Sequence, residues 1–169
     1  MTGERGNGQR GTREDEVLLR DAQEGDLAVF FEHQRDAVAC RMAAFTSRGQ
    51  EEFLAHWKKK VLGDAGVIKQ TVVVQGEVAG HMVCFEQAGR RLVGYWIGRE
   101  FWGKAVATRA LTAFLAQVTD RPLHAYVAKG NVGSTRVLEK CGFVRSGEDR
   151  VDSEEEPNAV EEWVFVQTA

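Results

Sequence analysis

The sequence is poor in cysteine and histidine, and neither residue type is arranged for a disulfide framework or a metal site. The three cysteines, Cys40, Cys84 and Cys141, are an odd number with no short pair spacing, which argues against a disulfide scaffold and against a zinc knuckle. The four histidines are scattered, with no i, i+4 pair, so we expect no metal cofactor. We expect the cysteines to be small thiols in a reducing compartment.

Long apolar runs and an excess of positive charge are also missing. No apolar stretch approaches the roughly 20 residues needed to span a bilayer, and residues 1–16 lack the apolar core of an export signal. The net charge of −3 provides no basic field that would recruit nucleic acid. We therefore expect a cytoplasmic protein whose partners are neither nucleic acid nor a membrane.

The composition that is present is typical of one globular domain, with 43% hydrophobic and 28% charged residues. Residues 1–14 contain no apolar anchor and are expected to form a flexible tail. Residues 15–169 show neither an internal repeat nor a domain boundary, so a single domain with one core is expected.

The first half of the domain predicts an antiparallel sheet with helices before it. Glu16–Arg20 is a strand candidate, and a helix is expected over residues 27–34 with Asp26 as its N-cap. Apolar residues on one face predict a second helix over residues 53–61. Three strands rich in β-branched and aromatic residues, joined by tight turns, would then form a meander: Val67–Val74, Val78–Phe85 and Arg91–Gly98.

The second half changes character after the meander. A long apolar stripe predicts a helix over residues 104–118, and Leu123–Val127 follows it as a strand. A strand–helix–strand series of this length is typical of a right-handed crossover between parallel strands. A short helix, Ser134–Lys140, and two strands, Phe143–Arg150 and Val160–Gln167, complete the domain. The expected fold is α/β, with a mixed, mostly antiparallel sheet of six to seven strands and about four helices.

The segment Tyr95–Leu111, YWIGREFWGKAVATRAL, is the first that indicates chemistry. A strand runs through a turn of small residues directly into an amphipathic helix. The first amides of a helix have no partner within it, and they carry the positive end of its dipole. Gly103 and Ala105 let a ligand approach this backbone, and Lys104 adds positive charge, so the turn suits a phosphate or a diphosphate.

The turn alone leaves two interpretations equal, because a tight strand-to-helix connection also needs small residues. It does not contain the G-x-G-x-x-G dinucleotide motif, and the sequence has no P-loop. An unrelated nucleotide-binding α/β domain would require a parallel sheet throughout, and the β-branched hairpin within residues 67–85 argues against it.

A second segment, NVGSTRVLEKCGF at Asn131–Phe143, follows one strand later. The two segments, in this order and spacing, resemble the GNAT superfamily of N-acetyltransferases over roughly residues 17–166. The likeness is greatest to the subgroup of ribosomal-protein alanine and serine N-acetyltransferases, in which YWIG…FWGKG-x-AT-x-AL and N-x-x-S-x-x-x-L-x-K-x-GF are characteristic.

The resemblance implies a sheet that splays between its fourth and fifth strands, with acetyl-CoA in the gap. Main-chain groups of Trp96, Ile97 and Gly98 would pair with the pantetheine arm. Asn131 would bind the arm from the other side, and Ser134 would lie near the sulfur. The amides of the turn and the first helical residues would hold the diphosphate: Gly103, Lys104, Ala105, Val106, Ala107 and Thr108. Trp102, just before them, is a further cofactor-binding residue. Two residues depart from the family motif, since Glu100 replaces a Gln or Arg and Ala105 replaces a Gly.

For catalysis, the resemblance implies an oxyanion donor at the Ile97 amide and a group that protonates the departing thiolate. Many members use a tyrosine seven residues after the asparagine, where this chain has Leu138, so Ser134 is the nearest substitute. An N-cap role of Ser134 in the short helix is an equally weighted alternative. The amine must lose a proton before it attacks, and Glu86 is the first candidate base, followed by His81 and Tyr95.

The expected activity is acetyl transfer from acetyl-CoA to an amine acceptor, either a protein N-terminus or a small molecule. The alternative is a non-catalytic module that binds or senses acyl-CoA. The acidic segment Glu148–Pro157 is either a solvated loop or a surface that attracts a cationic amine. A homodimer is a further expectation from the resemblance.

Overall fold

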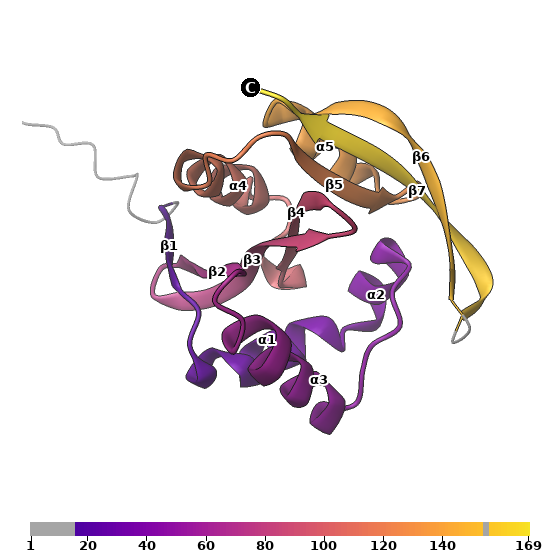
Figure 1. Ribbon diagram of the computed structural model, residues 1–169. Helices are drawn as coiled ribbons and strands as arrows, with labels where there is room; N and C mark the ends of the chain where they lie inside the picture. Colours follow the sequence, from indigo (N-terminus) through magenta and orange to yellow (C-terminus); the bar gives the residue numbers. More distant parts are fainter. Residues whose placement is uncertain (1–15, 154–155) are drawn as a thin grey trace, which may run out of the picture.

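The computed structural model describes residues 16–153 and 156–169. Its seven strands form one sheet in the order β1-β2-β3-β4-β5-β7-β6 (Figure 1). The strands are β1 Val17–Asp21, β2 Ile68–Val74, β3 Glu77–Gln87, β4 Arg90–Ile97, β5 Leu123–Ala128, β6 Val144–Ser153 and β7 Glu156–Gln167. Neighbouring strands are antiparallel except β4 and β5, which are parallel. The predicted fold class is confirmed, and the single parallel pair excludes a parallel nucleotide-binding sheet.

Five α-helices of the described residues cover the two faces of the sheet. They are α1 Leu27–Gln34, α2 Ala37–Ala43, α3 Gln50–His56, α4 Val106–Gln117 and α5 Val132–Lys140. Helices α1 to α3 gather on one side and α4 with α5 on the other (Figure 1). Each side has its own apolar cluster, one around Phe30 and Trp57 and a larger one around Leu111 and Phe114. The apolar stripe of α4 therefore packs as its periodicity predicts.

The largest differences from the sequence-based expectation lie in three places, and the other elements differ from it by no more than two residues at their ends. Helix α2 was not expected, because only Ala39 of its seven residues is buried and no apolar stripe marks it. The helix expected over 53–61 starts at Gln50 and continues from α3 into a π-helical segment, Trp57–Leu62. The last two strands extend beyond Arg150 and before Val160, because backbone pairing of a hairpin does not require apolar side chains.

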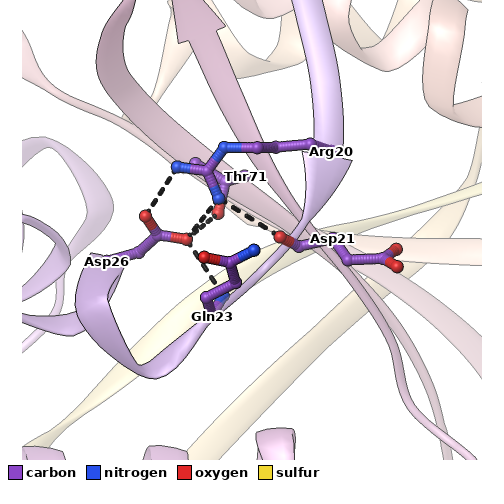
Figure 2. Close-up of polar contacts among 5 residues, drawn as sticks. All are labelled: Arg20, Asp21, Gln23, Asp26 and Thr71. Carbon is purple, nitrogen blue, oxygen red and sulfur yellow. Dashed lines mark hydrogen bonds and ion pairs between the residues drawn. The ribbon is translucent and has the colours of Figure 1, made fainter.

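Asp26 is the N-cap residue of α1, as predicted, but its side chain makes no capping hydrogen bond to that helix. Its buried carboxylate accepts two hydrogen bonds from Arg20, at 2.7 and 2.8 Å, and one from the Thr71 hydroxyl at 2.7 Å (Figure 2). It also accepts the Gln23 amide at 3.0 Å, which closes the 3-10 turn before α1. Asp26 thus ties β1, β2 and the start of α1 together.

Two predictions fall on parts of the chain that the structure does not describe. The expected tail, residues 1–14, lies outside the described residues. In the acidic segment 148–157, residues 154 and 155 lie outside them, and the side chains of 150–160 are likewise not described. Glu148 is described, and its carboxylate pairs with Lys129. Among the described helices, none is long and apolar enough to cross a membrane.

Candidate functional site

The sheet opens between β4 and β5. The two strands pair only at Arg91 with Leu123 and at Leu92 with His124. From Val93 to Ile97, β4 keeps its pairing with β3 but has no partner on β5. The splay that the family resemblance predicted is therefore present at the C-terminal end of β4.

A cavity of about 390 Å³ occupies this opening. It is lined by Ala39, Met42, Ala43, Tyr95, Trp96, Ile97, Phe101, Trp102, Gly103, Ala105, Val106, Ala107, Thr108, Asn131, Gly133, Ser134 and Val137. All the cofactor-binding residues predicted from the sequence are among them except Gly98 and Lys104. The structure thus brings together residues from the two motif segments.

The first turn of α4 forms one wall of the cavity. The Arg109 amide makes the first bond of the helix, to the Ala105 carbonyl at 3.1 Å. The amides of Val106, Ala107 and Thr108 precede this bond, so they cannot be paired within the helix. All three residues line the cavity, and the positive end of the helix dipole adds to the attraction for an anion.

Ala105 reaches this position only in a left-handed backbone conformation, with φ of 59°. Such a conformation costs a non-glycine residue about 1–2 kcal/mol. We expect Ala105→Gly to raise the free energy of unfolding by about 0.5–1 kcal/mol, because relief of strain exceeds the added freedom of the unfolded chain. Urea denaturation measures the change. Ala113→Gly, inside α4, is the control and should instead lower stability by about 1 kcal/mol; a loss in both variants would contradict strain at Ala105.

The backbone of β4 presents alternate residues to the cavity. The Gly98 amide donates to the Ala79 carbonyl of β3 at 2.8 Å. Because successive residues of a strand turn their backbone groups to opposite edges, Trp96 also faces β3, while Tyr95 and Ile97 face the opening. This favours Ile97 and Tyr95 over Trp96 and Gly98 for main-chain contacts with a pantetheine arm. The Ile97 carbonyl already accepts the Trp102 indole at 2.9 Å.

Gly98 is explained by packing against α1. A Cβ at this position would lie 2.6 Å from Nε2 of His33. Glu100, which departs from the family motif, lies 4.0 Å from the same nitrogen, and 73% of its side chain is exposed. Burial lowers the pKa of His33, and Glu100 offsets only part of that. Glu100 is also absent from the cavity lining, so its exposed carboxylate does not enter the cavity.

Tyr95 and Ser134 meet across the cavity. The phenol oxygen of Tyr95, on β4, lies 2.7 Å from Oγ of Ser134, on α5. Burial raises the pKa of Tyr95 to about 12. The N-cap of α5 is Asn131, whose side chain accepts the Ser134 amide at 3.2 Å. The alternative N-cap role of Ser134 is therefore wrong, and its hydroxyl is directed to Tyr95.

The predicted base, Glu86, is separated from these residues. It is exposed at the far end of β3, opposite Arg91, where β4 still pairs with β5. His81 does not line the cavity either, because its ring packs between Phe30 and Trp57 at centroid distances of 4.8 and 4.7 Å. Burial lowers the pKa of His81 to about 3, so the ring is neutral. Of the three candidates, only Tyr95 lines the cavity.

Helix α2 forms a wall that sequence reasoning missed. Ala39, Met42 and Ala43 line the cavity, and their helix lies on the side of the sheet opposite α4 and α5 (Figure 1). The helix starts where the Asp36 carboxylate accepts the Ala39 amide at 3.0 Å. Asp36 also pairs with Arg99, just after β4, at 3.1 Å. Asp36, a residue type favoured at N-caps, was the sequence signal that could have revealed this helix.

The chemistry available in the described lining is narrow. Tyr95 is its only titratable residue, and its remaining polar side chains are Trp96, Trp102, Thr108, Asn131 and Ser134. Among the residues that the structure describes, no group of three His, Cys, Asp or Glu side chains could hold a metal ion. The site therefore offers hydrogen-bond donors and acceptors, together with an anion-binding position at the first turn of α4.

Solved structures of the same fold include three acetyltransferases. Spermidine N-acetyltransferase from Vibrio cholerae, in complex with CoA and spermine, is 17% identical with a TM-score of 0.76, covering 90% of this chain and 95% of that one. AAC(6')-Ib, in complex with ribostamycin and coenzyme A, is 19% identical with a TM-score of 0.73, covering 90% and 93%. A GNAT-family acetyltransferase from Bacillus anthracis is 20% identical with a TM-score of 0.73, covering 90% and 94%. At such identities the likeness is one of fold.

The family assignment comes from the sequence itself. No curated protein matches the chain. The sequence model described as the acetyltransferase (GNAT) domain matches residues 16–144, which include β1 to β5, α1 to α5 and every residue that lines the cavity. The chain therefore belongs to the GNAT acetyltransferase family.

Proposed function

We propose that the chain transfers the acetyl group of acetyl-CoA to a primary amine, by direct attack within a ternary complex. One observation carries the proposal: a single cavity, between splayed strands, joins the first-turn amides of α4, which have no partner within the helix, to the Tyr95–Ser134 hydroxyl pair. When bound, acetyl-CoA supplies an activated thioester and a thiol leaving group. Several acetyltransferases of the same fold were solved in complex with coenzyme A, which supports this choice of acetyl donor.

Some residues of the cavity would bind the cofactor, and others would take part in the reaction. The amides of Val106, Ala107 and Thr108 bind the diphosphate. The Ile97 amide, which faces the opening, donates to the thioester oxygen as negative charge develops there. The Ser134 hydroxyl lies where the sulfur departs. Apolar walls exclude water, which strengthens each of these hydrogen bonds.

The acceptor would enter from the side of α2. Its wall of Ala39, Met42 and Ala43 is apolar, and the described lining contains no carboxylate. We infer an acceptor in which one amine is flanked by an apolar group, either a small arylalkylamine or the N-terminus of a protein with an apolar first residue. The resemblance to the ribosomal-protein subgroup is compatible with the second choice and stays a prediction.

A panel of amines tests the proposal. Purified chain is incubated with acetyl-CoA and phenethylamine, a methionyl peptide or spermidine, and thiol release is followed with mass spectrometry of the products. Acetylation of the first two in preference to spermidine supports the proposal. Tight coenzyme A binding by calorimetry without turnover of any amine would instead favour a module that senses acyl-CoA.

The pH dependence of kcat/KM should follow the amine rather than the protein. With no described lining group that titrates near neutrality, the amine loses its proton to water before it enters. The neutral fraction rises tenfold per pH unit below the amine's pKa, which is about 8 for a peptide N-terminus and about 10.4 for a lysine-like amine. We therefore expect kcat/KM to rise with unit slope and to level off at the pKa of each acceptor.

Amines of different pKa provide the control for this expectation. Tyr95, with a pKa of about 12, stays protonated over the whole range and contributes no break. A break near pH 6 to 7 that is shared by every amine would contradict the expectation, because it would reveal a base on the protein.

The proposed setting is the cytoplasm, with two copies pairing in solution. All three thiols are free, which suits a reducing compartment. Strands β1 and β6 are the edges of the sheet, and edge strands offer backbone groups to a second copy. Analytical ultracentrifugation distinguishes the dimer from a monomer.

A further inference from the structure

We propose that Tyr95 is a positioning residue for acetyl transfer: its phenol donates to Ser134 and thereby directs the Ser134 hydroxyl proton toward the departing sulfur. The inference rests on the proposed function, because it assigns a role within that reaction. Its geometric basis is the 2.7 Å contact between Tyr95 and Ser134, which come from opposite sides of the opening.

The direction of this hydrogen bond follows from the acidity of the two hydroxyls. A phenol is a much stronger acid than an alkyl alcohol and is therefore the stronger donor, while the alkyl oxygen is the stronger acceptor. Two hydroxyls that share one hydrogen bond use one of their two protons. If Tyr95 donates, the proton left over belongs to Ser134, which lines the same cavity.

The surroundings hold Ser134 in place for this role. Its backbone amide is bound by the Asn131 side chain at 3.2 Å, so the start of α5 fixes the Cα position. The phenol then selects the hydroxyl orientation. Leu138, at the position where many family members place a tyrosine, is buried in the core, so the described cavity draws its phenol from β4 instead.

The proton balance closes without an ionised tyrosine. As the C–N bond forms and the C–S bond breaks, Ser134 gives its hydroxyl proton to the sulfur and accepts one proton from the amine nitrogen. Its oxygen has the capacity for this, since a hydroxyl donates once and accepts twice. Tyr95 occupies one acceptor site throughout and keeps its own proton. Burial raises the pKa of Tyr95 to about 12, which suits a permanent donor.

Kinetics on three variants test the role. We expect Ser134→Ala to lower kcat by about a hundredfold and Tyr95→Phe by about tenfold, while the KM for acetyl-CoA changes by less than about twofold. The double variant should be no slower than Ser134→Ala, because Tyr95 acts only through Ser134. Tyr126→Phe is the matched control: it removes the other phenol of the chain, which accepts Arg90 outside the cavity, and should keep full activity.

A spectroscopic readout is independent of turnover. In Tyr126→Phe, Tyr95 is the only tyrosine, so the Raman tyrosine doublet reports whether its phenol donates or accepts. We expect the ratio of a donating phenol, lost when Ser134→Ala is added. An accepting phenol, multiplicative losses in the double variant, or a Tyr95→Phe variant as active as the control would each overturn the inference. A wild-type chain without turnover on any amine would instead contradict the proposed function and remove the reaction this role serves.

Discussion

Thr108→Glu should weaken acetyl-CoA binding by at least about a hundredfold, because it places a carboxylate at the proposed diphosphate-binding site, the first turn of α4. Like charges about 5 Å apart repel by about 3 kcal/mol at an effective dielectric constant of about 20, and each 1.4 kcal/mol or so is a tenfold change in Kd. Thr108 lines the cavity at the third position of α4. Calorimetric titration with coenzyme A measures the loss.

The substitution is chosen so that the fold survives it. A glutamate in the first turn of a helix interacts favourably with the helix dipole and is a common capping residue. The unfolding midpoint should therefore stay close to that of the wild type. Weaker binding with an unchanged unfolding midpoint would indicate a loss at the diphosphate-binding site and not a misfolded domain.

Thr112→Glu is the matched control for this variant. Thr112 lies one turn further along α4, is exposed and does not line the cavity. The same chemical change there should leave binding within about twofold of the wild type. Acetyl-pantetheine, which lacks the diphosphate, supplies a second control, since Thr108→Glu should turn it over as the wild type does. Equal retention of coenzyme A by both variants would contradict the proposed diphosphate-binding site.

The elements that form the site were predictable where a local pattern encodes them. The stripe of α4, the crossover to β5 and the turn at Gly103 all follow from spacing over a few residues. The conformation of Ala105 did not follow, because alanine rarely adopts positive φ and gives no signal of its own. The neighbouring Gly103 indicated a tight turn, and the apolar residues of the first helical turn indicated where the helix begins.

The arrangement of side chains across the opening was less predictable. Tyr95 and Ser134 are 39 residues apart, and no periodicity reports a contact of that range. The sequence favours Glu86 as a base because it ends a strand. Which strand end lies at the opening, however, depends on where β5 separates from β4. Helix α2 was not predictable from periodicity, because a short helix with one buried residue has no apolar stripe.

Asp26→Ala should lower the free energy of unfolding by about 3 kcal/mol or more, because it removes the common partner of a buried network. The Arg20 guanidinium loses two hydrogen bonds, and the fully buried Thr71 hydroxyl loses its acceptor (Figure 2). For a domain of this size the melting temperature should fall by roughly 6–12 °C. Asp26→Asn keeps the shape and one acceptor oxygen, so it should cost less. Calorimetry at neutral pH measures both.

Acid titration separates the charge of Asp26 from its shape. Burial alone would raise the pKa of Asp26, but hydrogen bonds from Arg20, Thr71 and the Gln23 amide outweigh it and hold the pKa below its usual value. The stabilisation by the carboxylate is therefore complete above its unfolded pKa of about 4 and is lost as the pH falls through the folded pKa. The difference in the free energy of unfolding between wild type and Asp26→Asn should become smaller in that pH range.

Asp21→Ala is the control for the network. Asp21 is an exposed neighbour whose side chain points away from the network (Figure 2), so the free energy of unfolding of this variant should stay within about 0.5 kcal/mol of wild type. Equal losses at Asp21 and Asp26 would show that the network does not hold β1, β2 and α1 together.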